Sequence, residues 1–414
     1  MSLRYDWKIA VIGAGGKISG GVLFELLDKK NIGGGEIYLY GRTRAKVENN
    51  IRIAEKIAPS GNRAFRLTYV EDMDDALKEA DIVFYSATPE LLSFGGYRAL
   101  GISQGAHILY IGEKMKALCP NAWLLVSTNP PDIPLMAVNR LFKLDKIIGL
   151  CNAPIIAKKS LVAYLSCNEE DLTLLEIGIN HDVWFYDILL KGRTIYDELR
   201  KKQNWDIEDS ANEYFNRFPE WKIALVNNIE ILKQTGYLPC PVGGTKRFTG
   251  LPVAWSKIAE LMKRPRDEDY LMLLEEDAGR VEILNLTRRC GGGITPYIGD
   301  VLGSILADDN KEHSLLVQNR GLFPSYPDEV MLQMTCRVGR KAFIRPDYVP
   351  VPGYIDGVLS PRVLQNNMAG RALALQSEKL MLQSMLLLPE RVSPAKAADI
   401  IKTGDNVEPY MPLN

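Results

Sequence analysis

The segment "AVIGAGGKISGG" (residues 10–21) places Gly13, Gly15 and Gly16 between a run of apolar residues and a predicted helix. In a strand, tight turn and helix of this kind, backbone N–H groups at the helix N-terminus can meet a pyrophosphate. We therefore predict that these three glycines bind a dinucleotide. The third glycine of the usual fingerprint is missing, because Ile18 stands there. A tight turn without a ligand is the alternative.

Short apolar runs alternate with amphipathic stretches over the first 150 residues, as in "EIYLYGR", "DIVFYSA" and "AWLLVSTNP". Strands that are apolar throughout are buried on both faces, which is typical of a doubly wound parallel sheet. After residue 150 this alternation is lost, and helical patterns at 220–234 and 364–387 accompany a strand-like "VMLQMTCRV". We predict an α/β protein with a Rossmann-like domain at 1–150 and a mixed α+β domain at 151–414.

The overall charge excludes some classes of partner. Fifty basic residues stand against 51 acidic ones, for a formal charge of −1, which gives no field for binding nucleic acid or an anionic membrane. No export signal opens the chain and no run of 18 apolar residues occurs, so we expect a cytoplasmic protein with a small-molecule partner. Six cysteines without CxxC spacing predict reduced thiols; they are residues 119, 151, 167, 240, 290 and 336.

The residues that follow Tyr40 bear on the choice of dinucleotide. An Asp or Glu after the second strand usually binds the ribose 2′-hydroxyl of NAD, but this chain has Gly41, Arg42, Thr43 and Arg44. Two guanidinium groups in place of a carboxylate fit a 2′-phosphate. The pattern therefore predicts that Arg42 binds the cofactor and keeps NADP open beside NAD. The alternative is that both arginines are solvated residues at the start of a helix.

A thiol and an imidazole follow two further apolar runs. Cys151 comes directly after "IIGL" and His181 after "LLEIGIN", so both should lie at the edge of the sheet where open α/β folds bind ligands. A thiolate and an imidazole with open positions beside them would form a catalytic divalent-metal site. Read from these residues alone, a buried inert cysteine and a structural histidine remain the alternative.

Three motifs point to a known family. "GLCNAP", "GINHDVWF" and the preceding "STNPPDIPL" resemble motifs of glycoside hydrolase family 4, the NAD- and manganese-dependent glycosidases. The block from "RRCGGGITPY" to about residue 350 resembles the C-terminal part of that family, so the resemblance starts at residue 8 and covers most of the chain. It implies a lactate and malate dehydrogenase-like fold and a homo-oligomer, a dimer or a tetramer.

The same resemblance implies roles for individual residues. Cys151 and His181 would bind Mn²⁺ or another divalent metal within residues 151–414. The residues expected to contact the dinucleotide or the sugar are Thr128 and Asn129 for the cofactor, and Asn129, Asn152, Asn180 and Arg289 for the substrate. In this family a bound cofactor oxidises the sugar at C3, which acidifies the C2 proton and lets the glycosidic oxygen leave. The metal stabilises the resulting enediolate.

The sequence departs from the family in two further places. The segment before "STNP" is shorter by some twenty residues, and the stretch "PCPVGGTKRFTGL" lacks the tyrosine that serves the family as base. Tyr237 or Lys246, or else Tyr97 or Tyr297, would have to replace it. These departures predict a glycosidase acting on a non-phosphorylated or anionic sugar.

Two other classes remain open. A 2-hydroxy acid or sugar dehydrogenase would share the fold, but "LCNAPIIAKKS" has Asn152 and no arginine where the lactate and malate enzymes carry an Asp and Arg pair. A non-catalytic relative that only binds a dinucleotide or sugar would explain the missing tyrosine. It would not explain the retention of both Cys151 and His181.

Overall fold

The computed structural model describes residues 3–58, 64–87, 97–202, 212–241, 257–258, 279–290 and 293–387; for residues 97–104 and 289–290 it describes the backbone alone. Lys246 lies outside these ranges, and the side chain of Arg289 is not described.

Six parallel strands form the first half of one long sheet, in the order β3-β2-β1-β4-β5-β6. Their bounds are β1 Trp7–Ile12, β2 Gly35–Tyr40, β3 Phe65–Val70, β4 Ile82–Tyr85, β5 Trp123–Val126 and β6 Ile147–Gly149. The order turns back on itself between β1 and β4, so the loops at their carboxyl ends diverge and leave room for a ligand. The predicted doubly wound parallel sheet is confirmed.

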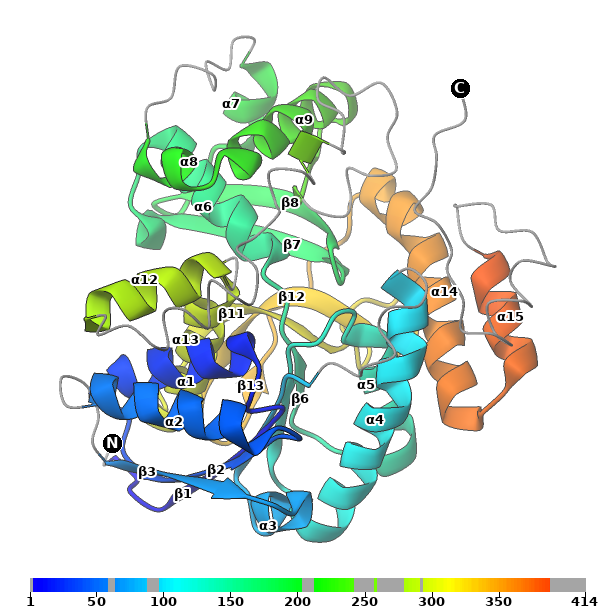
Figure 1. Cartoon of the computed structure of the whole chain (residues 1–414). Helices are drawn as coiled ribbons and strands as arrows, with labels where there is room; N and C mark the ends of the chain where they lie inside the picture. Colours follow the sequence, from blue (N-terminus) through cyan, green and yellow to red (C-terminus); the bar gives the residue numbers. More distant parts are fainter. Residues whose placement is uncertain are drawn as a thin grey trace.

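Helices cover both faces of these strands. Figure 1 shows α1 and α2 on one side of the sheet, and α4 and α5 on the other. The helices of this half are α1 Lys17–Asp28, α2 Arg44–Ile57, the short α3 Met73–Leu77, α4 Tyr97–Leu118 and α5 Asp132–Phe142.

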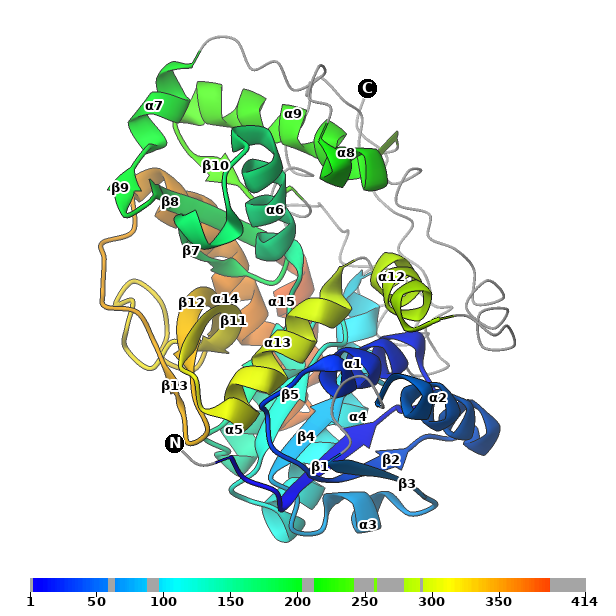
Figure 2. The same ribbon diagram turned by 90° about the vertical axis from the view of Figure 1, so that its left-hand side faces the viewer.

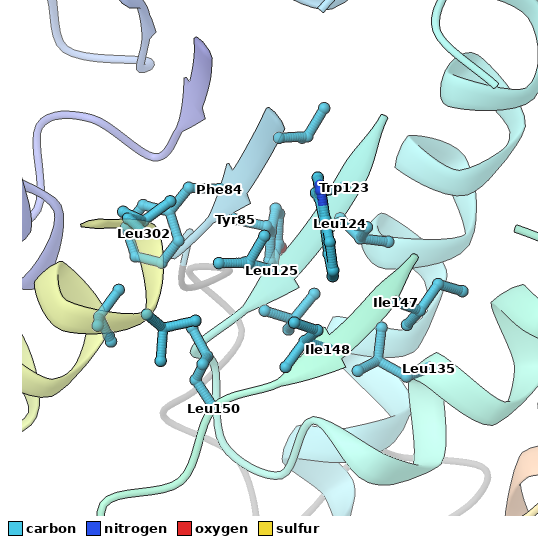
Figure 3. Close-up of a cluster of buried hydrophobic side chains, with 14 of the residues drawn as sticks. Phe84, Tyr85, Trp123, Leu124, Leu125, Leu135, Ile147, Ile148, Leu150 and Leu302 are labelled. Carbon is cyan, nitrogen blue, oxygen red and sulfur yellow. The ribbon is translucent and has the colours of Figure 1, made fainter. Parts of the chain in front are cut away.

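The centre of this half is apolar on both faces of the sheet. Every residue of β4, β5 and β6 is buried, and Leu135 of α5 and Leu302 of α13 (Ile294–Ala307) pack against them (Figure 3). Burial of each such side chain stabilises the fold by roughly 1.5–3 kcal/mol. This packing explains why the sequence of these strands shows continuous apolar runs rather than alternation.

The sheet continues past β6 without a break. Strand β11 pairs with β6 in antiparallel orientation at Leu316 and Gly149, and the order then runs β11-β12-β7-β8-β10. A Cβ on Gly149 would lie 2.9 Å from the Cβ of Leu316, so a glycine is required where the halves join. The strands of this half are β7 Leu172–Ile179, β8 Asp182–Leu190, β9 Arg193–Thr194, β10 Leu238–Pro239, β11 Lys311–Gln318, β12 Met331–Val338 and β13 Phe343–Ile344. The division at residue 150 stays a prediction.

The helices of the second half form two groups. One group surrounds β7 and β8 at one end of the molecule (Figure 2) and encloses a second cluster of buried apolar residues; it consists of α6 Ala153–Leu165, the 3₁₀ helix η3 Glu169–Asp171, α7 Tyr196–Lys201, α8 Glu213–Arg217 and α9 Pro219–Thr235. The other group packs on the first half, with α12 and α13 against α1 and with α14 against α5 and α15. It consists of α12 Arg280–Cys290, α13 Ile294–Ala307, α14 Gly353–Leu375 and α15 Glu378–Leu386.

Within the described ranges, no helix combines the length and the apolar character needed to cross a membrane. The cysteines whose side chains are described form no disulfide with one another; they are Cys119, Cys151, Cys167, Cys240 and Cys336.

Candidate functional site

The glycine-rich turn joins the end of β1 to α1. Gly13 has φ +89°, and a Cβ there would lie 2.6 Å from the backbone nitrogen of Ala87, so only glycine fits. The N–H groups of Gly13 and Ala14 donate to the carbonyl of Tyr40 at 3.0 and 2.9 Å, which ties the turn to the end of β2. Gly16 is the N-cap of α1 and provides no side-chain cap, which leaves N–H groups of the first helical turn for a ligand.

Thr128 and Asn129 follow β5 at the same carboxyl edge of the sheet. The Asn180 Nδ2 donates to the Asn129 Oδ1 at 2.7 Å, which links this loop to the turn between β7 and β8. The Thr128 Oγ1 is buried and makes no hydrogen bond to any described residue. Because buried hydroxyls normally have a partner, this atom fits a ligand group at the edge of the sheet.

Cys151 and His181 meet at this edge. Cys151 lies two residues beyond the end of β6, and His181 occupies the two-residue turn between β7 and β8 with φ +65°. The backbone N–H groups of Ala153 and His181 hydrogen-bond the Cys151 sulfur. Burial raises the pKa of the Cys151 thiol to about 12, while these two hydrogen bonds act to lower it. The structure therefore brings together the two residues that the sequence predicted as metal ligands.

The chemistry of this pair fits a divalent transition metal. A thiolate and an imidazole both bind such metals, and a bound cation favours deprotonation of the thiol. Among the described residues, no group of three or more His, Cys, Asp or Glu side chains is placed to hold a metal. A metal on Cys151 and His181 would therefore keep positions open for water or substrate, as catalytic sites do.

Helix α14 supplies polar partners that sequence reasoning missed. The Arg362 Nε lies 3.5 Å from the Asp182 Oδ2, next to His181 in the chain. The Asn366 Nδ2 donates to the Asp132 Oδ2 at 2.7 Å, at the start of α5 and three residues after Asn129. Both carboxylates are buried, and a buried carboxylate needs such partners. In the sequence, only Asp132 in "STNPPDIPL" and Asp182 in "GINHDVWF" indicated that polar partners would be needed here.

A polar layer lies in the sheet beneath the site. Glu176 on β7 is buried and accepts hydrogen bonds from the hydroxyls of Thr335 on the adjacent β12 and of Ser314 on β11, one strand further. Burial raises the pKa of Glu176 to about 7. Together with His313, these residues line a cavity of about 620 Å³.

A second cavity, of about 380 Å³, opens beside Asn152 at the start of α6. Its lining includes three basic residues, Lys159, Arg217 and Arg288, and a single carboxylate, Glu213, among the described residues. Arg288 is paired with the buried Glu25 carboxylate at 2.5 Å. The excess of positive charge therefore comes from Lys159 and Arg217, and it suits an anionic ligand. Arg288 precedes the predicted contact Arg289, whose side chain lies outside the description.

The candidate bases are placed differently from one another. The Tyr237 ring stacks on Tyr354 with centroids 5.9 Å apart, and the Arg200 guanidinium lies 5.0 Å from its centre. Tyr297 is buried, donates its hydroxyl to the Ser314 carbonyl and has its pKa raised well above the usual value by burial, which makes it a poor base. Lys246 and the side chain of Tyr97 lie outside the described structure, so the identity of the base stays a prediction.

The two arginines predicted to fit a 2′-phosphate, Arg42 and Arg44, have different surroundings. Arg42 follows the end of β2 and is exposed. Burial of His107 on α4 is the main cause of the lowered pKa of that histidine, and the charge of Arg42 lowers it further. Arg44 instead pairs with Glu48 at 2.7 Å and Glu71 at 3.2 Å.

Comparison with protein families gives matches along most of the chain. The model of "Family 4 glycosyl hydrolase" matches residues 8–94 and 88–167, and that of "Family 4 glycosyl hydrolase C-terminal domain" matches residues 177–390. A 6-phospho-beta-glucosidase from Escherichia coli K12 is 25% identical over 60% of this chain, which spans 54% of that protein's length. An alpha-galacturonidase from Thermoanaerobacter italicus is 23% identical over 92% of this chain and 91% of its own.

Solved structures share the fold. A 6-phospho-alpha-glucosidase from gut microorganisms, in complex with NAD and Mn²⁺, has a TM-score of 0.75 at 17% identity and covers 96% of both chains. The 6-phospho-beta-glucosidase from Thermotoga maritima, with manganese, NAD⁺ and glucose-6-phosphate, has a TM-score of 0.74 at 17% identity over 97% of both chains. A lactate dehydrogenase from a deep-sea metagenome library has a TM-score of 0.57 at 14% identity, covering 91% of this chain and 99% of its own. The predicted dehydrogenase-like fold is confirmed.

Proposed function

Because the chain belongs to the family 4 glycosyl hydrolases, we propose that it hydrolyses an O-glycosidic bond with a bound nicotinamide dinucleotide and a divalent cation such as Mn²⁺. One observation carries the proposal: the backbone N–H of His181 contacts the Cys151 sulfur at the sheet edge that also carries the glycine-rich turn. The dinucleotide site and the metal site would thus lie on the same edge of the sheet. The complexes of two structural neighbours with NAD and manganese support the same pair.

The chain would contribute binding and orientation at this edge. Cys151 and His181 would hold the cation, and the linked amides of Asn129 and Asn180, 2.7 Å apart, would orient sugar hydroxyls. When bound, the dinucleotide would take up and return the C3 hydride, and the cation would polarise the C3 oxygen. A base of the chain would remove the C2 proton, after which the glycosidic oxygen leaves from C1 and water adds there. In the proposed division at residue 150, each domain provides one of the two cofactor sites.

We propose an anionic sugar as the substrate. The cavity beside Asn152 supports this choice, because Lys159 and Arg217 line it with only Glu213 as a carboxylate in the described lining. Arg288 also lines it, although its charge is balanced by Glu25. Guanidinium groups bind carboxylates and phosphates in a bidentate manner. The names of the relatives include both kinds of anionic glycoside, the 6-phosphoglucosides and the galacturonides.

The test is turnover in deuterated water. A panel of α- and β-glycosides, neutral and anionic, would be assayed with Mn²⁺, each dinucleotide and a thiol reductant. We expect the released sugar to carry deuterium at C2 while the dinucleotide shows no net reduction, because the hydride returns. Reduction of the dinucleotide in proportion to product would identify a dehydrogenase instead. Cleavage without C2 label and without a dinucleotide would indicate two-carboxylate catalysis and overturn the proposal.

A further inference from the structure

We infer that the dinucleotide of this chain carries a 2′-phosphate, bound by Arg42, Thr43 and Lys46 beside the glycine-rich turn, so that the chain selects NADP over NAD. This inference rests on the proposed function, since it requires a dinucleotide at Gly13–Gly16. It concerns residues that lie at the adenosine end of that site, away from Cys151 and His181.

The position of the usual ribose-binding carboxylate is closed. Residue 41, directly after β2, is a glycine, and a Cβ built there would lie 2.9 Å from the Val47 Cγ2 and 3.2 Å from the Gly15 nitrogen. An Asp or Glu at this place would therefore push against both α2 and the turn. With no carboxylate at residue 41, the usual hydrogen bonds to the 2′-hydroxyl of NAD are missing there.

The beginning of α2 faces the dinucleotide turn. The Thr43 carbonyl accepts the N–H groups of Lys46 and Val47 at 3.0 and 3.3 Å, which forms the first helical turn. A Cβ on Gly15 would lie only 3.1 Å from the Cβ of Lys46, so the stem of Lys46 adjoins the turn that would hold the pyrophosphate. Thr43 is the N-cap of α2, and its hydroxyl makes no cap hydrogen bond. Both residues border the place where the adenosine ribose would lie.

The charges at this place are arranged for an anion. Lys46 has no ion-pair partner within the described residues. The charge of Arg42 reaches His107 on α4, and the His107 Nδ1 lies 2.6 Å from the Tyr85 hydroxyl at the end of β4. The positive charge of Arg42 therefore acts on a group at the carboxyl edge of the sheet, although the Arg42 side chain is exposed. The N-terminus of the 14-residue helix α2 adds further partial positive charge.

Arg44 shows the contrast within the same helix turn. It pairs with Glu48 of its own helix and with Glu71, and its guanidinium lies 5.2 Å from the centre of the Tyr69 ring on β3. Its charge is thus held at the outer strand, away from the dinucleotide turn. The chain therefore offers a matched control in Arg44, a third basic residue within two positions of Arg42 and Lys46 that is held by Glu48 and Glu71.

The experiment measures binding to the purified protein by isothermal titration calorimetry, with NADP⁺, NAD⁺, 2′-AMP and 5′-AMP as probes. We expect wild type to prefer NADP⁺ to NAD⁺ and 2′-AMP to 5′-AMP. Arg42→Ala and Lys46→Ala should each weaken NADP⁺ and 2′-AMP about ten- to hundredfold, the usual worth of a charge-assisted contact, and leave NAD⁺ within about twofold. Arg44→Ala should leave all four affinities within the same factor.

Two outcomes would overturn the inference. Equal or tighter binding of NAD⁺ by wild type, with the manganese site intact, would refute the 2′-phosphate site and leave the proposed function standing. Equal losses of NADP⁺ affinity in Arg42→Ala and Arg44→Ala would show a general effect of charge rather than a site. If neither dinucleotide bound the protein, both the inference and the proposed function would fail.

Discussion

Replacement of Glu176 by Gln should change how the stability of the protein depends on pH. Glu176 is 3% exposed on β7, and its carboxylate accepts hydrogen bonds from Ser314 and Thr335. Burial outweighs these bonds and raises its pKa from an ordinary 4.5 to about 7. The folded state therefore holds a proton that the unfolded chain releases at lower pH.

The direction in which stability changes with pH follows from the pKa of Glu176 being higher in the folded than in the unfolded state. The stabilising effect of the bound proton is fully present below pH 4.5 and is lost as the pH rises through about 7, where the folded protein must ionise a buried carboxyl. At 1.36 kcal/mol for each unit of pKa, the loss amounts to about 3 kcal/mol. A glutamine has no proton to lose, so the variant should lack this part of the pH dependence.

The measurement is the free energy of unfolding by urea at several pH values from 4.5 to 8, in wild type and Glu176→Gln. We expect the difference between the two proteins to change by about 3 kcal/mol over this range, with wild type gaining relative stability toward acid. Glu36→Gln is the control of opposite sign, because hydrogen bonds from Arg66 and Tyr38 lower the pKa of Glu36. A difference between wild type and Glu176→Gln that stayed constant with pH would refute the reasoning.

Three further predictions follow from the same structure. Cys151→Ser and His181→Ala should each abolish Mn²⁺ binding, measured by calorimetry, while dinucleotide binding persists; unchanged metal binding in both variants would remove them as ligands. Arg288→Ala should lower the free energy of unfolding by about 2 kcal/mol, because it leaves the buried Glu25 carboxylate without the cation now 2.5 Å away; an unchanged urea midpoint would contradict this. Burial lowers the pKa of His313 to about 4, so its contribution to stability is lost as the pH falls from about 6.5 to 4. In His313→Gln, the free energy of unfolding by urea should fall less between about pH 6.5 and 4 than in wild type. An equal fall in both proteins would contradict this prediction.

The fold was predictable from the sequence where strands are buried on both faces of the sheet. The strands around Phe84, Leu125 and Ile148 are buried on both faces, so their apolar runs appear in the sequence without any knowledge of their neighbours. The convergence of Cys151 and His181 was predictable for a related reason. Each residue follows a strand, and strand ends are the positions at which an open sheet collects ligand-binding groups.

Other parts of the site depend on contacts between residues far apart in the chain. Arg362 reaches Asp182 and Asn366 reaches Asp132 from a helix whose sequence carries no periodic signal for such contacts. Arg44 looked equivalent to Arg42 in the sequence, because Glu71, which helps to hold it, lies on another segment 27 residues away. Local patterns specify which groups reach the edge of the sheet, but they do not specify the distant residues that contact each of them.

The position of the proposed metal ligands Cys151 and His181 follows from how the two halves of the sheet join. In the parallel half, every carboxyl end lies at one edge, so the glycine-rich turn, Asn129 and Cys151 reach that edge from β1, β5 and β6. In the antiparallel half a hairpin turn can reach the same edge, and the turn after β7 brings His181 there to contact the Cys151 sulfur. The contact between Gly149 and Leu316 sets how closely β6 and β11 approach. The proposed site, with a dinucleotide bound by one half and a metal ligand supplied by the other, therefore lies at this junction.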